Sequence, residues 1–190
     1  MITLGEIERI ARLFVSECPN TSMTPLLALI KASESKEWLK LRELLDFVGL
    51  KNKQVKSIYQ PLVKLGLVDI RYKESDTSQF SSVEVKISTA VHHTDNLFNR
   101  DLIGVIFNDL LEVNARHHSV SCLAVLFLLA VKVFKISDSK EVSRFIGNDS
   151  RARNACSKMI TIFDASGITQ SLKTDTYQNA PVHIFEVDGT

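Results

Sequence analysis

The chain has 190 residues, of which 45% are hydrophobic, so it can bury the core of one large domain or of two small ones. Its 23 lysines and arginines nearly balance its 22 aspartates and glutamates, which excludes a global positive field that would attract nucleic acid or a membrane. Any basic surface that binds such a partner must therefore be local.

Cysteine usage and the apolar runs favour a cytoplasmic protein that has no contact with a membrane. The three cysteines are scattered and odd in number, which argues against a disulfide framework. Acidic residues come early in the chain, where a signal peptide would have a basic region followed by an apolar one. The most apolar run, residues 120–134, is too short to span a bilayer and contains Lys132.

The first half of the chain is predicted to form helices followed by a hairpin. Apolar residues recur at steps of three and four in the helices and alternate in the strands. Thr24 suits the cap of the second helix, Pro25 suits its first turn, and Gly49 suits the end of the third helix. In chain order we expect helices over residues 2–18 and 24–33, a short strand over 38–41, helices over 42–48 and 51–65, and strands over 67–72 and 83–87.

The helix predicted over residues 51–65 has two distinct faces. Its apolar face comprises Val55, Ile58, Leu62 and Leu65. Pro61 removes one hydrogen bond and should kink the helix, but the apolar period continues across it and Gly66 ends the helix. The outward face comprises Asn52, Lys53, Lys56, Ser57, Gln60 and Lys64.

The second half follows a similar order after a long helix over residues 95–117, whose broad apolar face must pack on another helix. Gly167 corresponds to Gly66, because each lies 17 residues before a matching hairpin position, Ile184 or Val83. We expect domains over residues 1–92 and 93–190, the long helix belonging to the second. The remaining predicted elements are helices over 120–134, over 137–146 with Ser137 as cap and Gly147 as stop, and over 150–166, then strands over 168–173 and 182–187.

Helix, strand, helix, basic helix and hairpin is the order of a winged helix-turn-helix. The segments TPLLALIKA, LKLRELLDFVGL, KNKQVKSIYQPLVKLGLVDIRYKESD and SSVEVKIST resemble the winged-helix core of MarR-type bacterial transcription regulators, strongly in the first half and weakly in the second. The resemblance implies a mainly α fold with small β hairpins, an α+β class, arranged as a tandem winged helix-turn-helix. Two copies in one chain, and no helix after the second hairpin, depart from the MarR pattern.

Basic residues concentrate between Lys51 and Lys73, where six basic residues accompany one acid, Asp69. We expect double-stranded DNA to bind there, with Asn52, Gln54, Ser57 or Gln60 available for base edges. A solvated helix face is the alternative. In the second copy, Arg151 and Arg153 could contact DNA or simply be solvated. The basic residues of the first copy that we expect at the phosphates are Lys51, Lys53, Lys56, Lys64, Arg71 and Lys73.

Catalytic chemistry is not expected, because no Ser-His-Asp set, glycine-rich phosphate loop or paired carboxylates stand out. We therefore expect neither an enzyme nor a cofactor. The pairs His92-His93 and His117-His118 adjoin helix ends and lack further ligands at metal-binding spacing, so no metal site is expected. Cys156 could sense oxidation, although a lone buried cysteine is more often a small apolar residue.

Three functions remain open. The first is a sequence-specific transcription regulator, which the local basic helix favours, acting as a homodimer through the helices over residues 2–18 and 95–117. The second is a plasmid- or phage-type replication or partition protein that also binds DNA. The third is a winged-helix scaffold that binds only protein, against which the basic helix argues.

Overall fold

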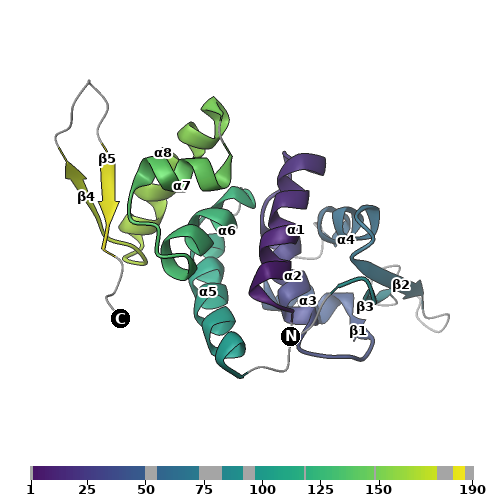
Figure 1. Cartoon of the computed structure of the whole chain (residues 1–190). Helices are drawn as coiled ribbons and strands as arrows, with labels where there is room; N and C mark the ends of the chain where they lie inside the picture. Colours follow the sequence, from purple (N-terminus) through teal and green to yellow (C-terminus); the bar gives the residue numbers. More distant parts are fainter. Residues whose placement is uncertain are drawn as a thin grey trace. The chain divides into compact units, whose positions relative to one another are not determined.

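The computed structural model describes residues 2–49, 55–72, 83–91, 97–117, 119–147, 149–174 and 182–186. Helices predominate and the sheets are small and antiparallel, as expected for the α+β class (Figure 1). The chain forms two compact units, Met1–Cys122 and Leu123–Thr190. Among the described residues, every helix is too short or too polar to cross a bilayer.

The first unit contains the predicted order of helix, strand, helix, helix and hairpin. Its strands form a three-stranded antiparallel sheet in the order β1-β3-β2, so that Leu39 of β1 and Ile70 of β2 both lie opposite Val85 of β3. The elements are α1 (Leu4–Glu17), α2 (Thr24–Ala32), β1 (Leu39–Lys40), α3 (Leu41–Phe47), α4 (Val55–Lys64), β2 (Val68–Tyr72), β3 (Val83–Ile87) and α5 (Leu97–Arg116).

The long helix α5 belongs to this first unit, whereas the boundary predicted between residues 92 and 93 assigns it to the second. It packs against α2, and Phe107 stacks on Phe47 of α3 with ring centroids 5.7 Å apart. The apolar residues Ile103, Ile106 and Leu110 are buried. The predicted need of this helix for a packing partner is thus met in part by α2 and α3.

Thr24 does not cap α2, contrary to the sequence-based prediction. It is the first residue of the helix, and the capping position falls on Met23, which makes no side-chain capping bond. The buried Thr24 hydroxyl instead donates to Oδ1 of the buried Asn114 on α5, at 3.0 Å, and accepts from the Ser22 hydroxyl at 3.1 Å. Buried Asn114 needs such a partner, and sequence spacing gives no sign of a contact so distant along the chain.

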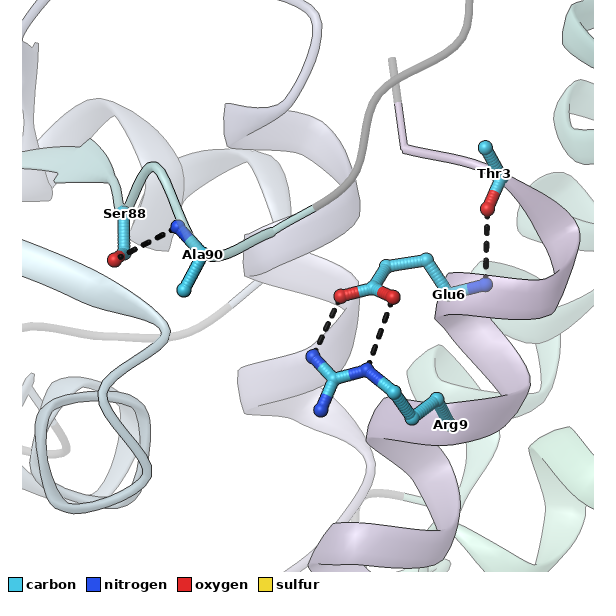
Figure 2. A network of polar contacts seen from close by, with 5 residues as sticks. All are labelled: Thr3, Glu6, Arg9, Ser88 and Ala90. Atoms are coloured by element: carbon cyan, nitrogen blue, oxygen red, sulfur yellow. Dashed lines mark hydrogen bonds and ion pairs between the residues drawn. The ribbon is translucent and has the colours of Figure 1, made fainter.

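A buried acid lies near the start of α1. The Thr3 hydroxyl caps the helix by accepting from the Glu6 amide at 3.0 Å, and the buried Glu6 carboxylate accepts from Arg9 Nε at 3.0 Å and Nη2 at 2.6 Å. Figure 2 shows this pair on the side of α1 that faces Ser88 and Ala90, just after β3. The hydrogen bond to Glu6 raises the pKa of Arg9. Pairing makes the burial of this carboxylate tolerable.

The second unit is built around three phenylalanines. Phe127 of α6 stacks on Phe163 of α8 with ring centroids 5.3 Å apart and meets Phe185 of β5 edge-on at 5.4 Å, so it joins α6 to α8 and to the hairpin. The helix predicted over residues 120–134 is a short α-helix that continues as a π-helix. The elements are α6 (Leu123–Leu128), η2 (Leu129–Val133), α7 (Ser139–Ile146), α8 (Ser150–Ala165), β4 (Ser171–Thr174) and β5 (Val182–Phe185).

Asp138, and not the predicted Ser137, caps α7. Its carboxylate accepts from the amides of Lys140 at 2.6 Å and Glu141 at 3.3 Å. The Ser137 carbonyl accepts from the Phe185 amide at 2.8 Å, so the main chain of Ser137 is bonded to β5. Asp138 also forms a single antiparallel bridge with Ile184 on β5. In the first unit Lys40, which precedes α3, pairs with Glu84 on β3 in the corresponding way.

Helix α4 of the first unit and helix α8 of the second end with the same turn. The Gly66 amide donates to the Val63 carbonyl and the Leu67 amide to the Leu62 carbonyl, at 3.0 and 2.9 Å. Gly167 and Ile168 make the same bonds to Asp164 and Phe163, at 2.9 and 3.0 Å. Both glycines have positive φ, +65° and +69°. This is the Schellman motif, which leads each helix directly toward a hairpin.

Alanine at Gly66 or Gly167 is expected to destabilise its unit by about 1–2 kcal/mol, because a Cβ is strained at positive φ. Gly104→Ala is the matched control: Gly104 lies within α5, its φ is negative and a Cβ there has open space. That change should stabilise by up to about 1 kcal/mol. Urea unfolding measures all three, and a neutral or stabilising Gly66→Ala would contradict the expected strain.

Candidate nucleic-acid interface

The two predicted faces of α4 are present. Ile58 and Leu62 are buried, whereas Lys56 and Gln60 are exposed on the opposite side together with Ser57 and Lys64. The helix runs through Pro61 without ending. The other predicted contacts in this region, Lys51, Asn52, Lys53, Gln54 and Lys73, lie outside the described residues, as does most of the predicted wing, residues 73–82.

Packing within the first unit fixes which way this face of α4 points. The helix packs against α2 and α3 through its buried side. At its C-terminal end, the Lys64 ammonium donates to the Glu17 carbonyl at the end of α1, at 3.1 Å. The Gly66 turn then leads into β2. The exposed polar stripe is therefore presented by a helix that is held along its length and at its end.

Arg71, a predicted phosphate contact, is engaged within the protein. Its Nε donates to Glu84 Oε2 at 2.6 Å, and its Nη2 lies 2.5 Å from the same oxygen. Its guanidinium also lies over the Trp38 ring, 4.4 Å from the centroid. The Glu84 side chain is only 7% exposed and that of Arg71 is 50% exposed. The first task of Arg71 is thus to neutralise a buried carboxylate, which leaves less of its charge for a phosphate.

A hollow of about 560 Å³ borders the exposed stripe of α4. Ser57, Gln60, Pro61 and Lys64 form one side of it. The other side is the connection between α1 and α2, with Cys18, Asn20, Thr21 and Ser22. Sequence reasoning missed this connection. Its run of Asn-Thr-Ser after Pro19 is polar enough to notice, but only the fold brings it beside α4.

The third helix of the second unit presents a polar face of its own. Arg151, Asn154 and Lys158 are exposed at steps of three and four, so they share one side of α8. Arg153 is also exposed, but its position two residues after Arg151 turns it to a different side. Two members of this stripe, Arg151 and Lys158, belong to the basic residues that stand out in the sequence, and the helical period adds Asn154.

A cluster of polar side chains ties the second hairpin to the end of α8. Asp164 accepts from the Thr169 hydroxyl at 2.6 Å and from the Ser171 hydroxyl, and Ser171 Oγ lies 3.2 Å from His183 Nδ1. Because the serine proton goes to the carboxylate, the imidazole cannot act as its base in this arrangement. The cluster is a structural link. β4 begins at Ser171 and not at the predicted Ile168, because the amides of Ile168 and Thr169 donate to the Phe163 carbonyl, at 3.0 and 3.4 Å, in the turn after α8.

The thiol of Cys156 is poorly suited to sensing oxidation. It is buried, its Sγ lies 3.6 Å from the Ser139 carbonyl oxygen, and burial raises its pKa to about 11. Burial also raises the pKa of Cys122. The reactive thiolate is therefore scarce at neutral pH. Of the histidines considered as ligands, His117 is exposed, and His92, His93 and His118 lie outside the described residues.

Iodoacetamide at pH 7.5 should modify the partly exposed Cys18 well before Cys122 or Cys156, since only thiolates react and buried thiols are shielded. Peptide mass spectrometry at successive times gives the order. Labelling in urea serves as the control, where all three cysteines should react at similar rates. Native Cys156 reacting as fast as Cys18 would reopen its role as a sensor.

Arg71→Met is expected to destabilise the first unit by about 2–3 kcal/mol, because it removes the cation beside a buried carboxylate. Arg116→Met is the matched control. Arg116 pairs with Glu112 at 2.7 Å, and these side chains are 55% and 44% exposed, so its loss should cost less than about 1 kcal/mol. Equal losses in urea unfolding would mean that Arg71 is an ordinary surface residue.

No protein family, curated protein or solved structure matches this chain in comparisons of sequence and structure. Function must therefore be inferred from the residues of α4, the β2–β3 hairpin and α8 themselves.

Proposed function

We propose that the protein is a sequence-specific double-stranded DNA-binding transcription regulator of the winged helix-turn-helix type. In this proposal α4 enters the major groove and the β2–β3 hairpin lies against the flanking backbone. The support is the element order of the first unit, the β1-β3-β2 strand order and the position of the hairpin directly after α4.

The second unit, in the same proposal, is another winged helix. Three features support a repeat. Both units have helices followed by a hairpin, and both have the Schellman turn after the last helix before the hairpin, α4 or α8. In both, the residue just before α3 or α7 also pairs with the last strand, β3 or β5. The bridge joins Asp138 to Ile184, as Lys40 pairs with Glu84, so Ile184 corresponds to Glu84, one residue after the predicted Val83. The chain would then be a tandem of two related units.

The observation that carries DNA binding is the composition of the exposed stripe on α4. Lys56, Gln60 and Lys64 follow one another at steps of four, opposite the buried Ile58 and Leu62. Lysine ammonium groups suit phosphate or guanine, and a glutamine amide can pair with the adenine edge through two hydrogen bonds. Acidic side chains are absent from the described part of this helix, from Lys56 to Lys64, so nothing within it opposes the polyanion.

A protein-binding scaffold is the second candidate, and one feature of the second unit favours it. Leu172 and Ile184 lie opposite each other on β4 and β5 and are 61% and 43% exposed. Two exposed aliphatic side chains on one strand pair form an apolar spot that suits a protein contact. A replication or partition role would share the DNA binding of the first candidate and differ in where its sites lie.

Self-association stays a prediction outside this proposal. It depends on the apolar surfaces of the helices predicted over residues 2–18 and 95–117. The apolar residues of both helices are largely buried within the chain: Ile7, Ile10 and Phe14 of α1, and Ile103, Ile106 and Leu110 of α5. On the described side chains of α5, Val105 is the large apolar residue that remains exposed. A single exposed valine is ordinary on a protein surface and does not require a partner.

Lys56→Ala should weaken binding to a duplex selected from a random pool and reduce the slope of log K against log salt by about one, because one phosphate contact releases about one counterion. Gln60→Ala should leave that slope unchanged and alter which sequences the pool yields. Val63→Ala, an uncharged change on the same helix at a partly exposed position, is the control. Fluorescence anisotropy at several salt concentrations measures the slopes, and equal slopes for the wild type and Lys56→Ala would count against α4 as the reader.

A further inference from the structure

The hollow beside α4 combines hydrogen-bond donors with one positive charge. Among the described residues that line it, Lys64 is the charged one. The other polar side chains there carry amides or hydroxyls and belong to Asn20, Thr21, Ser22, Ser57 and Gln60. None of these described residues is acidic. Amide, hydroxyl and ammonium donors without a competing carboxylate favour an anion that accepts several hydrogen bonds.

Lys64 also offsets the partial negative charge at the end of α1, next to the hollow. The C-terminal end of α1 brings partial negative charge to Glu17, next to the hollow. The Lys64 ammonium donates to the Glu17 carbonyl and so offsets that charge. An ammonium carries three N–H donors, and this bond uses one of them. The same side chain can therefore bind the helix end and a ligand together.

The connection between α1 and α2 is held in place by hydrogen bonds of the first unit. The Thr21 amide donates to the Cys18 carbonyl at 2.9 Å, Ser22 bridges Ser121, and the Met23 amide donates to the Val120 carbonyl at 2.7 Å. The Ser22 hydroxyl donates inward to Thr24. The Thr21 hydroxyl and Asn20 amide thus stand on a fixed backbone, which lowers the entropic cost of using them in binding.

We propose that this hollow seats one phosphate of the DNA backbone, with Thr21 and Asn20 on one side of it and Lys64 on the other. The inference rests on the proposed DNA binding by α4, because the hollow shares Gln60 and Lys64 with the exposed stripe of that helix. A phosphate held beside Gln60 fixes the register of the helix against the bases. The α1–α2 connection would then set how deeply α4 enters the groove.

Thr21→Glu tests this proposal, because it places a carboxylate at the hollow. We expect it to weaken binding of the selected duplex at least about tenfold at low salt, through repulsion of the phosphate. Asn108→Glu is the matched control, since it adds the same charge to the exposed side of α5, which contributes nothing to the hollow. Lys64→Gln should reduce the salt slope by about one. Thr21→Val, which removes only the hydroxyl, guards against misfolding of the glutamate variant and should weaken binding several-fold.

The outcomes separate this inference from the proposed function. A wild type that binds no duplex overturns both. If Lys56→Ala weakens duplex binding but Thr21→Glu and Thr21→Val bind the duplex as tightly as Asn108→Glu, only the proposed phosphate site is overturned. Titration with inorganic phosphate tests for a free anion as the occupant. If Thr21→Glu abolishes phosphate binding and leaves duplex affinity at the level of Asn108→Glu, the hollow serves a free phosphate and the proposal is wrong.

Discussion

The burial of α2 is the constraint on which the first unit depends. Residues from Leu26 to Ile30 are apolar and almost completely inaccessible, so this stretch of the helix has no solvent face, and only Lys31 near its end is partly exposed. A helix that is apolar on all sides must be covered on all sides, and α1, α3, α4 and α5 all pack on it. Covering α2 fixes the buried side of α4 through Ile58 and Leu62, and the outward direction of Lys56 and Gln60 follows from that.

Hydrogen bonds and ion pairs then pair the buried polar side chains that lie within this apolar packing. Thr24 and Asn114 join α2 to α5, Glu6 is paired by Arg9, and Glu84 is paired by Arg71. Each contact satisfies a buried polar group that would otherwise destabilise the fold. For the two glutamates the partner is a half-exposed arginine, so these cations serve stability before any ligand. A count of basic residues along the chain therefore overstates the charge that the surface offers to DNA.

Hydrophobic periodicity in the sequence predicted the helices and strands because it is a local property. The spacing of Ile58 and Leu62 is enough to separate the faces of α4, and Gly66 and Gly167 were recognised as helix ends. Contacts between distant segments could not be found in this way. The Thr24 hydroxyl turns to Asn114, Asp138 replaces Ser137 as cap because the Ser137 carbonyl bonds to β5, and the α1–α2 connection meets α4 only in the fold.

The turn that ends both α4 and α8 has a consequence for how such a chain can diverge. The turn demands a left-handed backbone at one position, which glycine meets without strain, and its two hydrogen bonds use only main-chain atoms. The side chains on either side of the glycine are therefore free to differ. Leu65 and Leu67 flank Gly66, whereas Ser166 and Ile168 flank Gly167. Two descendants of one ancestral unit could thus lose nearly all sequence identity and still follow the same backbone path at the ends of these helices. A common origin of the two halves would then remain visible in the backbone geometry after it could no longer be detected in the sequence.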